Sequence, residues 1–388
     1  MPTMRFIDLA AQQKRIRKSI ETRIQAVLDH GQYIMGPEVK ALESALAKYT
    51  GVSHALSCSS GTDALLLALM ACGVEPGDAV FTTPFTFMAT AEVVSLLRAT
   101  PVFVDVDPVT YNIDPNGLER AVEALERGDA SIHPLPEGGA KLRPRGVIAV
   151  DLFGLPADYA RINAVAKKHG LFVIQDAAQS FGAERFGRKS CSMADIGCTS
   201  FFPAKPLGGY GDGGMCFTED PGLLDAMASF RVHGQGHDKY ENIRIGINGR
   251  LDTLQAAVLL SKFELFEEEM LLRRQVAERY DRLLNAKDTP VVTPRIPEGC
   301  LSAWAQYTVA IKDAQERPAM LQRLQDVGVP TAIYYPKPLH LQKAFGYLGY
   351  GAGDFPVSES LASRVFSLPM HPYLEEADQA RIAAVVTG

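Results

Sequence analysis

The chain has 388 residues, of which 47% are hydrophobic and 22% charged, so it is neither a disordered nor a fibrous protein. Its net charge of −6 argues against a nucleic-acid partner. No segment approaches the roughly 18 uninterrupted apolar residues of a membrane span, and the N-terminus lacks the apolar stretch of a signal peptide, so we expect a cytoplasmic protein without membrane contact.

From about residue 50 to 220, short β-branched runs alternate with amphipathic stretches. This alternation predicts strands and crossover helices around a mostly parallel sheet. The predicted strands are Ala79–Thr82, Val102–Val106, Gly146–Val150, Leu171–Ile174, Gly197–Phe201 and Met215–Thr218. The predicted helices are Thr62–Cys72, Ala89–Leu97, Pro115–Glu126 and Asp158–His169. The segment Arg127–Arg145, with its Pro, Gly and mixed charge, interrupts the pattern and is interpreted as a surface loop.

After Leu251 a helical pattern continues to residue 284, which is too long for one average globular helix and is expected to lead into a second unit. Strand-like Tyr307–Ile311 and helix-like Arg317–Val327 then predict a smaller α+β domain. We therefore expect an α/β protein in which residues 1–260 form a large domain and residues 261–388 a small C-terminal one.

A helix that starts among small and hydroxyl residues is the first feature with chemical content. The segment SCSSGTD at 57–63 leads directly into an apolar helix pattern. Free backbone N–H groups and the positive end of the helix dipole converge at such a start, which favours an anion beside Gly61 and Thr62. The alternative is that Thr62 is an ordinary N-cap.

Three polar residues, Asp151, Asp176 and Lys205, follow predicted strands, at the sheet edge where open α/β folds bind ligands. Asp176 is either an ordinary cap or loop acid, or a carboxylate that keeps a ring nitrogen protonated, because a negative charge favours the cationic form of its neighbour. Lys205 lies among aromatic, proline and glycine residues in SFFPAKPLGGYGDGG at 200–214. These surroundings favour a desolvated amine that attacks carbonyl groups over a surface lysine.

Patterns for other chemistries are absent or out of place. Gly209, Gly211 and Gly214 formally match GxGxxG, but the match neither follows a strand nor opens a helix, so we reject dinucleotide binding. The six cysteines lack paired spacing and the eight histidines form no HExxH motif. We therefore predict neither a disulfide framework nor a metal site.

Together, an anion-binding helix start, a strand-end carboxylate and a desolvated lysine are the groups needed to hold pyridoxal phosphate (PLP). The phosphate would dock at Gly61 and Thr62, the pyridine nitrogen would pair with Asp176, and Lys205 would bind the aldehyde carbon covalently. Phe87, which follows a predicted strand, either stacks on the cofactor ring or packs in the core.

The same segments resemble the DegT/DnrJ/EryC1/StrS family of PLP-dependent nucleotide-sugar aminotransferases, which have fold type I. The likeness runs from FIDLAAQQ near the start, through SSGTDAL, DAAQSFGA, SFFPAKPLGGYGDGG and NGRLDTLQAAVL, to SLPMHPYL near the end. The resemblance implies a large domain with a mostly parallel sheet between helices and a smaller C-terminal α+β domain.

The resemblance also implies a role for each matching residue. Lys205 would bind the cofactor, Asp176 would pair with the ring nitrogen, and Gln179 would lie against the ring face or the cofactor hydroxyl. Asn248 would reach the phosphate held by a second subunit, which implies a homodimer with shared active sites. The residues that would bind the phosphate within the subunit are Gly61, Thr62 and Ser200.

Reaction and substrate are also implied. A lysine rather than a histidine at position 205 favours transamination, with L-glutamate as donor, over sugar dehydration. The matches are most similar to enzymes that aminate C3 of a UDP-N-acetyl-3-keto-hexuronic acid, for polysaccharide and O-antigen (lipopolysaccharide) synthesis. Arg250 would grip the sugar carboxylate. Tyr334 and Tyr335 stand where those enzymes have a histidine-tyrosine pair, and they would also contact the substrate.

Several alternatives stay open. The substrate could instead be a UDP-4-keto-6-deoxy sugar, because family members that act on uncharged sugars also carry the arginine. A PLP-binding regulator would keep the fold without turnover, and a nicotinamide-dependent Rossmann enzyme would depend on the rejected glycine pattern. Cations are needed near the substrate diphosphate, and the candidates are Arg231, Lys239, Arg244, Lys337 and His340.

Overall fold

In the computed structural model, which describes residues 4–238, 240–285 and 289–388, seven strands form one sheet in the order β1-β9-β8-β5-β4-β2-β3. Neighbouring strands from β8 to β3 run parallel, whereas β9 lies antiparallel between β1 and β8. The prediction of a mostly parallel sheet is therefore confirmed. The strands are β1 (His54–Cys58), β2 (Asp78–Thr82), β3 (Thr100–Phe103), β4 (Arg143–Val150), β5 (Phe172–Asp176), β8 (Ile196–Ser200) and β9 (Gly214–Thr218).

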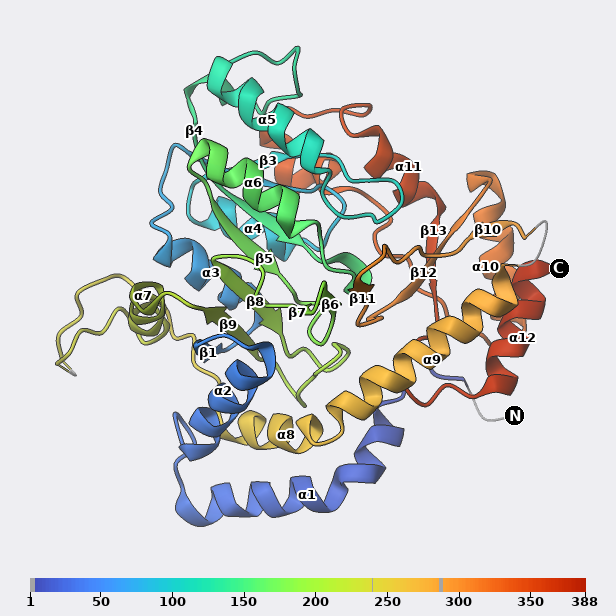
Figure 1. Cartoon of the computed structure of the whole chain (residues 1–388), viewed down its shortest axis with the longest axis horizontal. Helices are drawn as coiled ribbons and strands as arrows, with labels where there is room; N and C mark the ends of the chain where they lie inside the picture. Colours follow the sequence, from blue (N-terminus) through green and yellow to red (C-terminus); the bar gives the residue numbers. More distant parts are fainter. Residues whose placement is uncertain (1–3, 239, 286–288) are drawn as a thin grey trace.

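Helices cover both faces of this sheet (Figure 1). Alternate residues of a strand point to opposite faces, so Val147 and Ala149 of β4 pack against α5 and α6, while Ile148 faces the side of α3, α4 and α7. Burial on both faces explains why the strand sequences are almost continuously apolar. These helices are α3 (Gly61–Ala71), α4 (Ala89–Leu96), α5 (Pro115–Arg127), α6 (Tyr159–His169) and α7 (Pro221–Arg231).

The single helical pattern after Leu251 is divided into α8 (Thr253–Phe263) and α9 (Phe266–Leu284). No Gly or Pro marks the division. Phe263 and Phe266, on either side of it, both pack on the ring of Tyr49, with centroids 5.4 and 5.6 Å away. The two N-terminal helices lie beside α8, and they are α1 (Leu9–His30) and α2 (Pro37–Thr50).

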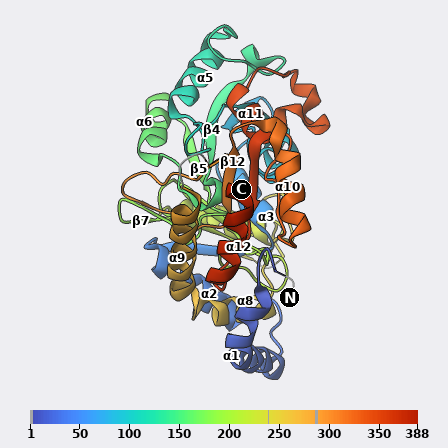
Figure 2. The same ribbon diagram turned by 90° about the vertical axis from the view of Figure 1, so that its right-hand side faces the viewer.

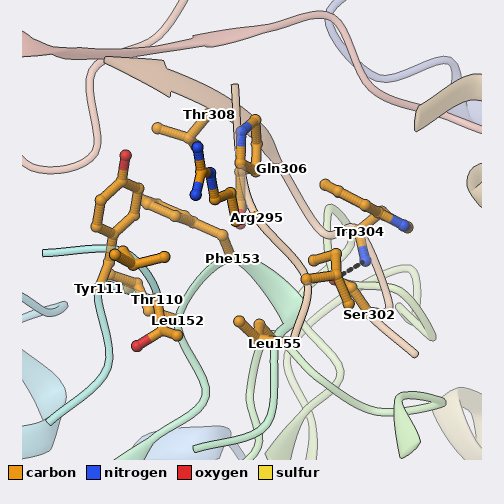
Figure 3. Close-up of a pocket in the computed structure, with 13 residues that line it drawn as sticks. Thr110, Tyr111, Leu152, Phe153, Leu155, Arg295, Ser302, Trp304, Gln306 and Thr308 are labelled. Atoms are coloured by element: carbon orange, nitrogen blue, oxygen red, sulfur yellow. Dashed lines mark hydrogen bonds between the residues drawn. The ribbon is translucent and has the colours of Figure 1, made fainter. Parts of the chain in front are cut away.

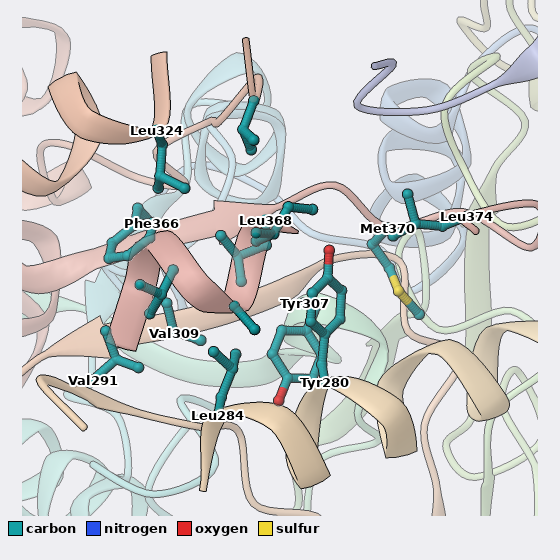
Figure 4. Packing of buried hydrophobic residues seen from close by; sticks show 14 of the residues in the cluster. Tyr280, Leu284, Val291, Tyr307, Val309, Leu324, Phe366, Leu368, Met370 and Leu374 are labelled. Carbon is teal, nitrogen blue, oxygen red and sulfur yellow. The ribbon is translucent and has the colours of Figure 1, made fainter. Parts of the chain in front are cut away.

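A second, antiparallel sheet in the order β10-β12-β13 lies beyond α9 (Figures 1 and 2). Its core joins the sheet to α9, α10 and α12, and the rings of Tyr280 and Tyr307 lie 4.7 Å apart within it (Figure 4). This is the smaller α+β unit expected for the C-terminal part, while the division at residue 260 stays a prediction. Its elements are β10 (Val291–Val292), β12 (Tyr307–Ile311), α10 (Arg317–Asp326), α11 (Pro356–Arg364), β13 (Val365–Leu368) and α12 (Glu376–Thr387).

Short strands complete the described part of the chain. β11 (Cys300–Leu301) pairs with β6 (Glu184–Arg185), which pairs with β7 (Arg188–Lys189), so the C-terminal part also contacts the large sheet's side of the molecule. None of the helices among the described residues combines the length and the apolar character needed to cross a membrane.

Two predicted strands differ from the structure by three residues at one end. The strand expected at Val102–Val106 is β3, which ends at Phe103 because its partner β2 ends opposite, at Thr82. The strand expected to begin at Gly146 is β4, which begins at Arg143, so the predicted loop ends earlier than Arg145. Between α5 and β4 the segment has only a short 3₁₀ turn at Gly139–Lys141, as expected of a loop.

Candidate active site

The predicted site residues gather at the carboxyl edge of the central strands. β5 ends at Asp176, β8 ends at Ser200, and β1 ends three residues before Gly61. Ser200 and Cys58 both lie opposite Gly214 of the intervening strand β9. The start of α3 and the ends of β5 and β8 therefore share one edge of the sheet.

Glycines allow close approach at the start of α3. A Cβ atom on Gly61 would lie 2.6 Å from Cβ of Ser200, and a Cβ atom on Gly214 would lie 2.3 Å from the carbonyl oxygen of Ser60. Neither distance leaves room for a methyl group. The sequence at these positions thus permits a backbone cradle between α3 and β8 that other residues would fill.

The N-cap of α3 is Ser60, whose Oγ accepts a hydrogen bond from the N–H of Asp63 at 3.0 Å. The alternative that Thr62 is the N-cap was therefore wrong. Within the described residues, the backbone N–H groups of Gly61 and Thr62 have no acceptor. The site keeps two free donors and the positive end of the helix dipole beside Ser200, which suits a phosphate.

Asp176 is a buried carboxylate, exposed by 7%. Its Oδ2 accepts a hydrogen bond from Thr90 Oγ1 at 2.9 Å, and its Oδ1 accepts one from the N–H of Ala178 at 3.2 Å. Burial raises the pKa of Asp176, while these two donors and the charge of Lys205 oppose the rise. A carboxylate in this environment is not an ordinary loop acid.

The next group at this edge is the side-chain amine of Lys205. Within the described residues, its Nζ has neither a hydrogen bond nor an ion pair. Burial lowers the pKa of Lys205, and the negative charge of Asp176 partly opposes this. These surroundings shift the amine toward its neutral, nucleophilic form, and its role toward a carbonyl stays a prediction.

Gln179 is fixed at both ends of its amide. Its Nε2 donates to the hydroxyl of Tyr335 at 3.2 Å, and its Oε1 accepts from the N–H of Phe153 at 2.8 Å. The ring of Tyr335 lies 6.4 Å from that of Phe87 and 5.9 Å from that of Tyr334. The structure thus brings together three of the predicted contact residues around Gln179.

Phe87 is 56% exposed, which excludes the alternative that it packs in the core. It follows β2 and borders the edge that holds Asp176. A large exposed aromatic ring at this edge is available to stack on a planar ligand.

The anchor of Gln179 lies beside a cavity of about 20 Å³ between the two parts of the chain (Figure 3). Its lining includes Phe153, Tyr111 and Trp304, whose φ angles are +59°, +63° and +48°. Non-glycine residues rarely adopt this left-handed conformation. Gly154 approaches the N–H of Trp304 so closely that a Cβ atom would lie 2.7 Å from it, so tight packing maintains the arrangement.

Asp151, the third polar residue after a predicted strand, is fully buried below the site. It accepts hydrogen bonds from Ala157 N–H, Tyr159 Oη, Gln175 Nε2 and Ser180 Oγ at 2.6 to 2.9 Å. Burial raises its pKa to about 6 although these donors oppose the rise. Asp151 therefore organises the sheet edge and does not face a ligand.

Asn248 and Arg250 form a pair. Oδ1 of Asn248 accepts from Nε and Nη2 of Arg250 at 2.9 and 2.6 Å. The carbonyl of Gly249 between them accepts from the N–H of Ser59 at 3.0 Å, so this segment lies beside the residues that lead into α3 of the same chain. Among the residues that the structure describes, none accepts a hydrogen bond from the amide nitrogen of Asn248.

Two of the proposed cations, Arg231 and His340, are buried beside carboxylates. Arg231 is 5% exposed and pairs with Glu43 at 2.9 Å, so it does not face a diphosphate. His340 is buried against Glu359 at 3.1 Å. Lys239 lies outside the described residues. The sequence gives no sign of these two pairings, because Glu43 and Glu359 lie far along the chain from Arg231 and His340.

Sequence analysis assigned no role to Thr90, which holds Asp176. The MATAEVV run around it predicts a helix but gives no signal that one hydroxyl faces a carboxylate 86 residues away. The rejected glycine pattern at Gly209–Gly214 lies in the loop before β9 and opens no helix, in agreement with that rejection.

The donor set fits PLP. Free N–H groups in a cradle without room for a Cβ suit its phosphate, the buried carboxylate suits its ring nitrogen, and the unpartnered amine suits its aldehyde. NtdA of Bacillus subtilis, whose structure holds the bound cofactor PMP, is 26% identical with a TM-score of 0.86, covering all of this chain and 86% of that one. PMP is the amino form of the predicted cofactor.

Comparisons with known proteins cover almost the whole chain. The UDP-2-acetamido-2-deoxy-3-oxo-D-glucuronate aminotransferase of Pseudomonas aeruginosa is 48% identical over 99% of each chain. The UDP-N-acetyl-3-dehydro-alpha-D-glucosamine 3-aminotransferase of Acidithiobacillus ferrooxidans is 40% identical over 98% of this chain and 96% of its own.

A crystal structure of an aminotransferase from Brucella abortus is 49% identical and superposes with a TM-score of 0.92, covering 99% of this chain and 98% of that one. The model of the DegT/DnrJ/EryC1/StrS aminotransferase family matches residues 14–387. The fold, the site geometry and these matches agree with the resemblance found in the sequence. The chain belongs to the DegT/DnrJ/EryC1/StrS aminotransferase family.

Proposed function

We propose that this enzyme moves an amino group from L-glutamate to the keto group of a UDP-linked sugar, with PLP as cofactor and C3 of an N-acetyl-hexuronic acid as the favoured acceptor. The observation that carries the proposal is the convergence of Lys205, Asp176 and the open start of α3 at one sheet edge. The full-length similarity to two aminotransferases named for UDP-3-oxo sugars supports the substrate class.

Each group has a defined task in this proposal. The N–H groups of Gly61 and Thr62, with Ser200, bind the phosphate, and Asp176 binds the ring nitrogen. Phe87 covers one ring face and Gln179 contacts the ring or its hydroxyl. When bound, PLP supplies an electron sink that stabilises negative charge on the amino-bearing carbon.

Lys205 has two tasks. Its neutral amine binds the aldehyde carbon of the cofactor at rest, and once displaced it moves a proton between Cα of the amino acid and C4′ of the cofactor. The lowered pKa of Lys205 supports both, because a nucleophile or proton acceptor must first lose its own proton.

A homodimer with shared sites forms part of the proposal. The free amide nitrogen of Asn248 is the donor that would reach the partner's phosphate, since its Oδ1 is held by Arg250. We further propose a cytoplasmic enzyme that supplies amino sugars for polysaccharide or O-antigen synthesis, as the resemblance implies.

The proposal has two candidate acceptors, a charged uronate sugar and an uncharged sugar. Arg250 would bind the carboxylate of a uronate, and Tyr334 and Tyr335 would contact the sugar beside the cofactor. A UDP-4-keto-6-deoxy sugar is the second candidate. The relative from Acidithiobacillus is named for an uncharged 3-dehydro sugar, which supports an acceptor without a carboxylate but not amination at C4.

The test offers the amino form of the enzyme a panel of keto sugar nucleotides and follows the return of the aldehyde-form absorbance. We expect the UDP-3-keto-hexuronate to react fastest. In Arg250→Met, its KM should rise by roughly tenfold or more, because a hydrogen-bonded charge pair contributes roughly 1.5–3 kcal/mol. KM for the uncharged sugars should rise less, because they lose only the support that Arg250 gives to Asn248.

Arg282→Met is the matched control, because Arg282 is exposed on α9 away from the sheet edge. Equal loss for charged and uncharged sugars in Arg250→Met would contradict a uronate-specific role. Purified protein that holds PLP but never takes an amino group from L-glutamate would instead support the regulator. Binding of a nicotinamide cofactor would support the third class.

A further inference from the structure

Two threonines of the segment that forms α4 make a hydrogen-bonded chain to Asp176. Oγ1 of Thr90 donates to Oδ2 of Asp176 at 2.9 Å, and Oγ1 of Thr86 lies 3.1 Å from Oγ1 of Thr90. Both threonines are buried, with 1% and 2% of their surface exposed. Nothing in the proposed reaction so far uses either hydroxyl.

The direction of this chain follows from the hydrogen-bonding capacity of the groups. An ionised carboxylate only accepts, so the single proton of the Thr90 hydroxyl points to Asp176. The proton between the two hydroxyls must then come from Thr86. Oδ1 of Asp176 has its own donor in the N–H of Ala178, so each carboxylate oxygen is held by one donor from the chain.

Donors of this kind stabilise the ionised form of a buried acid. Burial raises the pKa of Asp176, and the Thr90 hydroxyl, the Ala178 N–H and the charge of Lys205 counteract this. A more basic carboxylate holds a shared proton more strongly. When a carboxylate contacts a ring nitrogen, such donors therefore determine whether the proton lies on the oxygen or on the nitrogen.

We propose that Thr90, supported by Thr86, is a positioning residue that keeps Asp176 ionised and so keeps the pyridine nitrogen of bound PLP protonated. The proposal rests on the pairing of Asp176 with that nitrogen given under Proposed function. A protonated ring is the stronger electron sink, so the two hydroxyls act on the reaction without touching substrate or cofactor.

The experiment uses the full-length enzyme loaded with PLP that carries ¹⁵N in the ring, and the ¹⁵N chemical shift reports protonation directly. We expect the signal of the unchanged enzyme at the protonated position. In Thr90→Val, which keeps the shape but lacks the hydroxyl, the signal should move toward the neutral position. The amino transfer from L-glutamate should slow by roughly tenfold.

Thr90→Ser should restore both readouts, because serine keeps the donor. Thr86→Val should shift the signal in the same direction by less, since it removes only the second link. Thr82→Val is the control, because Thr82 is equally buried but donates to the carbonyl of Ile148 on the neighbouring strand. That variant should leave the signal in place.

An unchanged signal in folded Thr90→Val would overturn the role of Thr90. If that variant fails to fold, an unchanged signal in Thr86→Val overturns the hydroxyl chain. A neutral nitrogen in the unchanged enzyme would contradict the pairing with Asp176 itself, which separates failure of this inference from failure of the proposed site.

Discussion

Lys205 and Asp176 show burial acting in opposite directions on two side chains of one site. Desolvation disfavours the charged form of either group, so it lowers the pKa of the amine and raises that of the carboxyl. The charge of each group partly favours the charged form of the other. Burial thus favours the neutral amine of Lys205, while the donors to Asp176 favour its ionised form against the effect of burial.

A pH prediction follows for the cofactor-free enzyme. Because burial lowers the pKa of Lys205, its amine should become reactive toward PLP below pH 10.5, the ordinary lysine value. We expect covalent capture, measured by hydride trapping and mass spectrometry, to rise with pH and level off before that value. Asp176→Asn should move the midpoint lower, because the charge that favours the ammonium form is lost.

The lowered pKa of Lys205 also predicts how the free energy of unfolding changes with pH. Between the lowered folded pKa and 10.5, the unfolded chain binds more protons at this lysine than the folded chain does. The contribution of Lys205 to the free energy of unfolding therefore increases with pH in that window. In the trapping experiment described above, covalent capture of PLP that keeps increasing beyond pH 10.5 would contradict a buried amine.

At the scale of elements, the start of α3 depends on its approach to the end of β8. Gly61→Ala should weaken PLP binding by roughly tenfold or more, because forcing a methyl group against Ser200 costs about 1–3 kcal/mol. Fluorescence titration of the cofactor-free protein measures this. The matched control is Gly346→Ala, where no atom lies within 4 Å of the added Cβ and φ is not left-handed.

PLP affinity that falls equally in both glycine variants would contradict the cradle at α3. A loss confined to Gly61→Ala would support it. The covalent bond to Lys205 can mask a weakened phosphate site, so the titration is repeated in Lys205→Ala, where only non-covalent contacts hold the cofactor.

Much of the fold could be predicted because hydrophobic periodicity reports local structure. The strands that end at Asp176 and Ser200 and the helix after Ser60 were found to within two residues. The end of β3 was missed because it is fixed by its pairing partner. The break between α8 and α9 was missed because aromatic packing on Tyr49, and no Gly or Pro, accompanies it.

The site was predictable where one residue type has few other uses in its context. Lys205 among aromatics and glycines is such a case. Thr90 and the buried pairing of Arg231 with Glu43 were not, since both depend on contacts between residues far apart in sequence. An ordinary threonine or arginine gives no local sign of its partner.

For the molecule as a whole, the segment after α7 extends away from the rest of the chain at the left of Figure 1. It carries Ile245, which is 91% exposed, and Ile243, which is 54% exposed. Such apolar exposure near Asn248 favours a surface covered by a second copy. Ile245→Asp should therefore produce monomers in analytical ultracentrifugation, with reduced activity that rises again at high protein concentration.

Val327→Asp is the comparison variant. Val327 is 41% exposed at the end of α10, on the opposite side of Figure 1 from the segment after α7. It should sediment as the unchanged protein does. A fully active monomer of Ile245→Asp would contradict shared active sites.

The hydrogen bond from Ser59 to Gly249 ties the entry to α3 to the segment that carries Asn248. In a homodimer of the proposed kind, a contact that orders one of these two segments also orders the other. Thermodynamic reciprocity then requires that saturation with vitamin B6 tighten subunit association by the same factor by which association tightens vitamin retention. Dilution would therefore separate the subunits and release the vitamin together, so the enzyme would lose its yellow colour as it dissociates.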